Sequence, residues 1–173
     1  MIHPRIVDKP LGAIVGKLPR RLYGFMAMVS SVASPLILAG IVMIVIIISA
    51  IIGNDQLAWA GAIVLLLSPV AEFSKFITRR HRPETLYAEN MRLKTYSFPS
   101  GHAYVSALVF GFLAITAITW LTYGMLLAVV LIFLAFLVGV SRVYLGAHFP
   151  SDVIAGWTMG FAAQYLVWIK AGL

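Results

Sequence analysis

Long apolar stretches separated by short polar segments make up most of this chain. Five such stretches cover residues 29–52, 57–78, 101–119, 123–140 and 152–168. A helix needs about 20 mostly apolar residues to cross the hydrocarbon core of a bilayer, and each stretch is close to that length. The pattern therefore predicts an all-α fold, an integral membrane helical bundle with about five transmembrane helices. Pro69 lies inside the second stretch and predicts a kink there.

The segment before the first span has a different pattern. Between Pro10 and Leu22, apolar residues recur at helical spacing with basic residues alongside, which predicts an amphipathic helix lying in the membrane interface. A signal peptide is the alternative, but the apolar stretch that follows is too long for one and no small-residue cleavage site follows it. We therefore expect a basic interfacial segment over residues 1–28 and a transmembrane domain over residues 29–173.

Two polar segments, residues 79–99 and 141–151, are predicted to be extramembrane loops. Threading the five spans back and forth places both loops on the same face as the N-terminal segment, with only turns on the other face. Of the 13 Lys and Arg residues, Lys170 alone lies on the turn side, so the positive-inside rule favours the cytoplasm for the loops. Some of these cations are also candidate substrate ligands, which weakens the inference from charge.

The composition narrows the class of protein further. Hydrophobic residues make up 61% of the chain and charged residues 11%, whereas a soluble domain carries about 25% charged residues. The net charge of +7 does not indicate nucleic acid binding, because the basic residues cluster at helix ends and in one loop. Membrane headgroups or an anionic substrate explain them better. The chain has no cysteine, which excludes thiolate catalysis and thiolate metal sites.

Ionisable residues at the ends of membrane spans are costly, so they call for a reason. Lys75 lies in the last turn of the second span, and Arg82 follows seven residues later, before Pro83. If the helix continues, Lys75 and Arg82 face one point. The alternative is that these basic residues form only a stop-transfer cluster at the interface, and for Arg79 and Arg80 we prefer it. His81 is expected to be solvated.

Glu72 lies one turn before Lys75. Its carboxylate inside a span predicts either an internal ion pair with Lys75 or the lining of a polar access path.

A second polar group begins the third span. Ser100 is a natural N-cap, and the free N–H groups behind it, with the positive end of the helix dipole, form an anion site. Gly101 allows a ligand to approach the backbone, and His102 follows it. The alternative is an ordinary capped helix with a polar interfacial histidine.

The third group contains Arg142, His148 and Asp152. Pro150 suits the first position of a new helix, which places Asp152 in its first turn. A carboxylate four residues from an imidazole can accept its N–H and leave the other ring nitrogen bare as a nucleophile. Asp152 could instead be only a favourable charge at a helix N-terminus. Threading puts all three groups on one face, and cations, N–H donors and histidines together suit a phosphoryl group.

In order and spacing, these groups resemble the three-part signature of the type 2 phosphatidic acid phosphatases, a family of membrane lipid phosphatases. Residues from about 30 to 168 also follow that family's helix order, although its membrane members commonly have six spans. The matching motifs are Lys75-x6-Arg82-Pro83, Pro99-Ser100-Gly101-His102 and Ser141-Arg142-x5-His148-x3-Asp152.

The resemblance implies a role for each matched residue. His148 would be the nucleophile that forms a phosphohistidine, Asp152 would orient and stabilise it, and His102 would protonate the leaving group. It implies no metal or other cofactor, in agreement with the lack of a carboxylate cluster suited to Mg²⁺. The phosphate-binding residues would be Lys75, Arg82, Ser100, Gly101 and Arg142.

The expected activity is hydrolysis of a lipid phosphomonoester or pyrophosphate, such as phosphatidylglycerophosphate, phosphatidate or an isoprenoid phosphate, in a bacterial or archaeal cell membrane. A phosphotransferase that passes the phosphoryl group to an acceptor lipid would have the same motifs. A lipid-binding or lipid-transfer protein without turnover is the alternative outside enzymes, and the matched histidines and aspartate argue against it. Vanadium haloperoxidases share the signature, but they resemble large soluble proteins.

Overall fold

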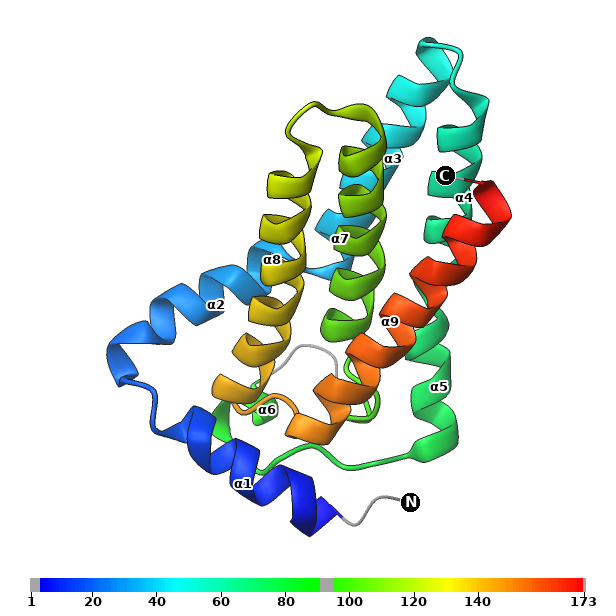
Figure 1. Ribbon diagram of the computed structural model, residues 1–173. Helices are drawn as coiled ribbons and strands as arrows, with labels where there is room; N and C mark the ends of the chain where they lie inside the picture. Colours follow the sequence, from blue (N-terminus) through cyan, green and yellow to red (C-terminus); the bar gives the residue numbers. More distant parts are fainter. Residues whose placement is uncertain (1–3, 91–94, 173) are drawn as a thin grey trace.

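The computed structural model describes residues 4–90 and 95–172, and every regular element in these residues is a helix, which confirms the all-α prediction. Figure 1 shows the helices in chain order. They are α1 (Pro4–Gly16), a short 3-10 turn (Arg20–Leu22), α2 (Tyr23–Val32), α3 (Pro35–Ile51), α4 (Asp55–Leu67), α5 (Val70–Thr78), α6 (Leu86–Glu89), α7 (Gly101–Trp120), α8 (Gly124–Tyr144) and α9 (Pro150–Ala171).

Three of the five predicted spans have helices that are long and apolar enough to cross a membrane: α7, α8 and the continuous pair α4–α5 over Asp55–Thr78. A fourth is added if the bent pair formed by Arg20–Val32 and Pro35–Ile51 is one span. The fifth, α9, has 22 residues but is not among them. Helix α9 packs against α7, α4 and α8. Its polar residues, such as Asp152 and Gln164, are therefore buried by protein and do not face lipid.

Two element boundaries at the N-terminal end differ from the sequence prediction. The amphipathic helix α1 begins at Pro4 and ends at Gly16, so Pro10 lies inside it. The first predicted span is divided into two helices, α2 and α3, which are bent by 46° relative to each other. Ser34 is extended and Pro35 opens α3, and an X-Pro pair disfavours continuing the preceding helix. The expected boundary between residues 28 and 29 falls inside α2.

The second predicted loop is shorter than expected. Helix α8 continues to Tyr144 and α9 begins at Pro150, so the connection covers only residues 145–149. Arg142 therefore lies in the last turn of a helix and not in a loop. A side chain on a helix is held more firmly than one on a loop, which matters for the site described below.

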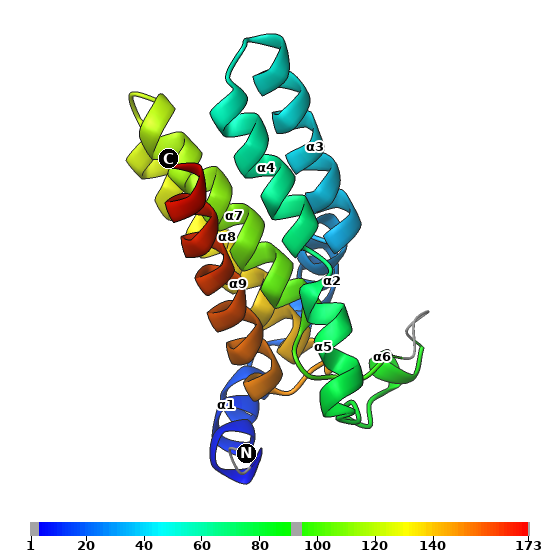
Figure 2. The ribbon, with the colours of Figure 1, turned by 90° about the vertical axis from the view of Figure 1, so that its right-hand side faces the viewer.

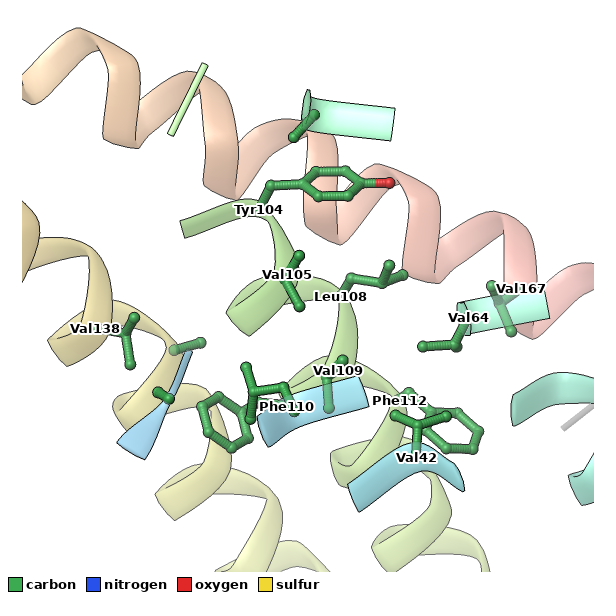
Figure 3. Packing of buried hydrophobic residues seen from close by; sticks show 14 of the residues in the cluster. Val42, Val64, Tyr104, Val105, Leu108, Val109, Phe110, Phe112, Val138 and Val167 are labelled. Carbon is green, nitrogen blue, oxygen red and sulfur yellow. The ribbon is translucent and has the colours of Figure 1, made fainter. Parts of the chain in front are cut away.

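Helix α7 is the centre of the bundle. Every residue from Ala103 to Phe112 is buried, and Tyr104, Leu108 and Phe112 are each at most 1% exposed. Neighbouring helices α3, α4, α8 and α9 close around α7, as Figures 1 and 2 show from two sides. The packing partners that Figure 3 labels on these helices are Val42, Val64, Val138 and Val167.

Close contact between α7 and α9 brings their N-termini together. A Cβ added at Gly156 would lie 2.7 Å from the carbonyl oxygen of Ser100, and one added at Gly160 would lie 2.4 Å from that of Tyr104. Glycine is therefore needed for this approach, as in other tightly packed membrane helices. The two helices run in the same direction, and both begin at the end of the bundle where α1 and α6 lie (Figure 1).

Candidate active site

The eight residues predicted to form a site lie at one end of the bundle, on the ends of four helices and the segments that join them. Lys75 is in the last turn of α5 and Arg142 in the last turn of α8. Ser100 is the N-cap of α7, followed by Gly101 and His102, whereas Asp152 is in the first turn of α9. Arg82 and His148 lie in the connecting segments before α6 and α9.

The ring of His148 is buried and has a fixed proton position. Its Nδ1 lies 2.8 Å from the backbone carbonyl oxygen of Ser97, and the side chain is 2% exposed. A carbonyl oxygen only accepts hydrogen bonds, so Nδ1 carries the proton and Nε2 keeps its lone pair. The guanidinium Nη1 of Arg82 lies 3.1 Å from Nε2 and donates to it. Nε2 therefore points at a cation and not at an apolar wall.

Burial and positive charge keep His148 neutral. Burial lowers the pKa of His148 well below its ordinary value of 6.5, and the charges of Arg82, Arg142 and Lys75 lower it further. The hydrogen bond to Ser97 opposes the shift. Because the ring is uncharged above its lowered pKa, the lone pair on Nε2 is available at neutral pH.

The nearest partner of His148 differs from the one expected. Asp152 Oδ2 lies 3.5 Å from Nδ1, farther than the Ser97 carbonyl, so Asp152 interacts with the ring electrostatically rather than as its main hydrogen-bond acceptor. Asp152 is fully buried, and its Oδ2 accepts a hydrogen bond from the backbone N–H of Phe149 at 2.9 Å. No side-chain pattern could have identified Ser97, because it acts through a backbone carbonyl that every residue type carries.

Arg82 reaches the site by a route that the sequence did not predict. Helix α5 ends at Thr78, and Arg79 adopts a left-handed conformation with φ of 49°. The helix therefore ends where the second span was predicted to end, and the condition under which Arg82 would follow Lys75 on the same helix face is not met. Carbonyl oxygens hold the Arg82 guanidinium instead: that of Thr95 at 2.8 Å from Nε and that of Ala147 at 3.0 Å from Nη1.

Lys75 and Glu72 form the internal ion pair that was one of the two expectations. The Lys75 Nζ lies 2.6 Å from Glu72 Oε1, with the lysine side chain 5% exposed and the glutamate side chain 50% exposed. A Cβ added at Gly101 would lie 2.4 Å from that same oxygen and 3.6 Å from the lysine Nζ. The ion pair therefore rests directly on the first turn of α7, and Gly101 leaves the space for it.

Arg142 is held between the bundle and the loop. Its Nη1 donates to the Ser30 hydroxyl on α2 and lies 3.3 Å from the Tyr87 hydroxyl on α6, and its guanidinium lies over the Tyr87 ring. Only 2% of Arg142 is exposed. The backbone N–H of Ser100 donates to the carbonyl oxygen of Asp152 at 2.9 Å, which ties the start of α7 to the start of α9.

The three cations act on both histidines. Charges of Lys75, Arg82 and Arg142 interact with the rings of His102 and His148 alike, and the two histidines interact with each other. Burial and the neighbouring charge of Arg142 lower the pKa of Arg82 from its ordinary value. The structure thus brings these cations, the start of α7 and the two imidazoles together at one end of the bundle. Such a group can bind a tetrahedral oxyanion and attack it from the side of His148 Nε2.

Besides Ser97, sequence reasoning missed Arg80, which contacts Asp152, and Asp8, which contacts Arg80. Arg80, interpreted as a stop-transfer residue, donates from Nη1 to Asp152 Oδ1 at 2.6 Å and from Nη2 to Asp8 Oδ2 at 2.7 Å. Arg79 and His81 are exposed, as expected. Hydropathy cannot separate Arg80 from Arg79, because both follow the same span and carry the same charge. Within residues 4–90 and 95–172, no three His, Asp or Glu side chains cluster as a metal site would require.

Comparison with known proteins supports a common family. The model of the PAP2 superfamily matches residues 56–172 of this chain. Phosphatidylglycerophosphatase B of Bacillus subtilis (strain 168) is 30% identical over 132 residues, which are 72% of this chain and 64% of that protein. Undecaprenyl-diphosphatase of Sulfolobus acidocaldarius is 35% identical over 102 residues, 56% of this chain and 46% of that protein. This chain thus spans less than two thirds of either relative.

Solved structures share the fold. The crystal structure of a transmembrane PAP2 type phosphatidylglycerolphosphate phosphatase from Bacillus subtilis has a TM-score of 0.79 and 25% identity, covering 95% of this chain and 84% of that chain. The Aquifex aeolicus LpxE structure has a TM-score of 0.69 and 20% identity, covering 94% of each chain. The first likeness confirms the predicted membrane helical bundle. With its family match extending over well more than half of its length, this chain belongs to the PAP2 superfamily.

Proposed function

We propose that this protein is a metal-independent lipid phosphatase that hydrolyses a lipid phosphomonoester or pyrophosphate through a phosphohistidine on His148. The observation that carries the proposal is the hydrogen bond from His148 Nδ1 to the Ser97 carbonyl, at 2.8 Å. It leaves Nε2 unprotonated on a neutral ring beside a cationic cluster, and a nucleophile for phosphorus needs that arrangement.

In the first step, Nε2 of His148 attacks phosphorus while the bond to the leaving oxygen breaks. Arg82, which now donates to Nε2, turns its Nη1 to a phosphoryl oxygen. Lys75, Arg142, the Ser100 hydroxyl and the N–H group of Gly101 bind the remaining oxygens, because charge on them must be stabilised in the transition state. His102 gives a proton to the leaving oxygen.

In the second step, water attacks the phosphohistidine and breaks the P–N bond. His102, which lost its proton in the first step, accepts one from the attacking water. Inorganic phosphate leaves, and His148 returns to its neutral form with the proton on Nδ1. Asp152 stabilises the ring electrostatically while it carries the phosphoryl group, since Oδ2 lies 3.5 Å from Nδ1.

The position of the site supports a lipid phosphate as the substrate. The cationic cluster lies where α5, α7, α8 and α9 reach the end of the bundle, so a headgroup phosphate can enter while its tail remains between apolar helices. The names of the two relatives give their substrates as phosphatidylglycerophosphate and undecaprenyl diphosphate. We extend the proposal to both classes, with phosphatidate and isoprenoid phosphates as further candidates.

We further propose that the site faces the cytoplasm, because the Lys and Arg residues that the structure describes, apart from Lys170, lie at its end of the bundle. The chain has no cysteine, so a single Glu84→Cys substitution in the exposed loop gives a specific label. Labelling of that thiol in intact cells by a membrane-impermeant reagent would place the site on the outer face and contradict the proposal.

A phosphate-release assay on purified protein tests the enzymatic proposal. The substrates are phosphatidylglycerophosphate, phosphatidate and undecaprenyl mono- and diphosphate in detergent, each with chelator or vanadate added separately. We expect release with at least one lipid, resistance to chelator and inhibition by vanadate. His148→Ala should abolish release, whereas His81→Ala, at an exposed histidine, should keep it.

Three results would contradict the proposal. Loss of activity with chelator would refute the metal-independent mechanism. Release by a folded His148→Ala protein would refute the phosphohistidine. Transfer of the labelled phosphoryl group to an added acceptor lipid, without release of inorganic phosphate, would identify a phosphotransferase.

A further inference from the structure

Two buried carboxylates from opposite ends of the chain share one guanidinium beside the candidate site. Asp8 comes from α1 and Asp152 from α9, and their side chains are 8% and 0% exposed. Arg80 donates from Nη2 to Asp8 at 2.7 Å and from Nη1 to Asp152 at 2.6 Å. Two different nitrogens of one planar group serve the two carboxylates, so the guanidinium fixes their relative positions.

The same residues also clamp the first turn of α9. Asp8 Oδ1 accepts a hydrogen bond from the backbone N–H of Ser151 at 2.8 Å, and Arg80 Nη1 donates to the Ser151 hydroxyl at 2.7 Å. The Arg80 guanidinium lies 4.3 Å from the centre of the Phe149 ring. Residues 149, 151 and 152 are all held by this network, and His148 directly precedes them.

We propose that Asp8 and Arg80 are positioning residues for the reaction, so that the N-terminal helix α1 is part of the catalytic apparatus. Arg80 holds Asp152 and the start of α9, which fixes the direction of His148 Nε2, and Asp8 holds Arg80 in place. This inference rests on the proposed function, because it assigns the orientation of the same nucleophile.

The charges explain why both partners of Arg80 are needed. An ionised carboxylate that is fully buried is stable only when it is paired and hydrogen-bonded. Arg80 supplies that pairing to Asp152, but its side chain is still 23% exposed and long enough to adopt other rotamers. Asp8 removes that freedom by holding the second guanidinium nitrogen. If Asp8 is removed, the Arg80 side chain should move more freely, and so should the first turn of α9 that Arg80 holds.

Asp8→Asn is the first test, because it keeps the shape of the side chain and removes its charge. We expect kcat to fall about tenfold with little change in KM, since misplacement of a reacting group affects the chemical step more than binding. Arg80→Gln should lower kcat further than Asp8→Asn does. Arg80→Lys should lie between the two, because a lysine keeps the charge but cannot bridge two carboxylates with separate nitrogens.

Two neighbouring substitutions serve as matched controls. Arg79→Gln removes an exposed cation next to Arg80 whose Nε donates to the carbonyl oxygen of Phe76 on its own helix. Asp55→Asn removes a carboxylate in the first turn of α4, at the opposite end of the bundle. Both controls should keep the wild-type kcat. Rates are divided by the folded fraction, measured by gel filtration and thermal unfolding in the same detergent.

A double substitution separates positioning from general stability. The amide oxygen in Asp8→Asn can still accept the Ser151 N–H, so what the substitution removes is the charge that acts through Arg80. Asp8→Asn should therefore cost almost nothing further once Arg80→Gln is present. Folded Asp8→Asn protein with wild-type kcat, or two effects that multiply in the double variant, would overturn the positioning role while leaving the phosphatase proposal intact. Wild-type protein inert toward every lipid phosphate would refute the proposed function and this inference with it.

Discussion

Replacing Arg82 with glutamine removes the charge that lies closest to the candidate nucleophile. Arg82 Nη1 is 3.1 Å from His148 Nε2, so a phosphoryl group bonded to Nε2 would lie within reach of the same nitrogen. Loss of one preorganised donor to a developing oxyanion costs about 2.7–4 kcal/mol, which is about 10²–10³ in kcat. Arg82→Lys keeps the charge but cannot reach the carbonyl oxygens of both Thr95 and Ala147, so we expect an intermediate loss.

The same substitution should move the pH profile in a defined direction. The positive charge of Arg82 is one of the causes that lower the pKa of His148, after burial itself. Without that charge the pKa of His148 rises, so the ring is protonated at a higher pH and the acid limb of kcat/KM shifts to higher pH. Burial and the other cations remain, so the limb should stay below the range of a free histidine.

The assay is phosphate release across a pH series with wild-type, Arg82→Gln, Arg82→Lys and Arg79→Gln proteins. Arg79→Gln is the control, since Arg79 is exposed. A loss in kcat of less than about tenfold for Arg82→Gln would show that Arg82 does not bind the transition state. An acid limb that stays in place, or moves to lower pH, would refute the electrostatic account of the neutral His148.

Three further predictions follow from the same geometry. Glu72→Gln frees the Lys75 ammonium, so inorganic phosphate should inhibit more strongly. Because Glu72 is half exposed, the gain in phosphate affinity should be at most about 1 kcal/mol, or about fivefold in Ki. Weaker inhibition than in the wild type would contradict this prediction. Gly160→Ala places a Cβ 2.4 Å from a backbone oxygen of α7 and should lower the free energy of unfolding by about 1–3 kcal/mol. Gly40→Ala is the control, because a Cβ there meets open space. Equal thermal unfolding temperatures for the two variants would refute this prediction. Because the pKa of His148 is lowered in the folded protein, the contribution of its neutral ring to stability is complete above pH 6.5 and is lost as the pH falls. His148→Gln should therefore flatten the acid side of a plot of unfolding temperature against pH. An unchanged slope would contradict this prediction.

Most helices of the bundle could be predicted from the sequence, because membrane helices are long and apolar. The prediction placed α7 and the second span closely, since both begin or end at strong local signals such as the Ser100 N-cap. It placed the end of α8 four residues too early, because Ser141 and Arg142 are polar and polar residues after a span indicate a loop. In the structure both residues lie within α8 and are buried. Hydropathy records the side chain alone and not the partner that covers it.

The site shows the same limit. His148 and Asp152 could be paired from their spacing, because four residues across a helix start bring two side chains close. The Ser97 carbonyl could not be predicted, since it reaches His148 from 51 positions away through a backbone atom. Asp8 and Arg80 are 72 positions apart, and nothing in their local sequence indicates a contact. Long-range contacts of this kind depend on tertiary packing.

The partners of the cations indicate which charge is available to a substrate. Lys75 is paired with Glu72, and Arg80 is paired with two carboxylates, so each has a compensating anion already. In the part of the chain that the structure describes, the hydrogen-bond partners of Arg82 are carbonyl oxygens, the Thr95 hydroxyl and a neutral histidine ring. A phosphate that approaches Arg82 therefore does not have to displace an anion, whereas one that approaches Lys75 competes with Glu72. Arg82 should consequently form the first contact with an incoming headgroup, and Lys75 should join after Glu72 has turned toward the exposed side.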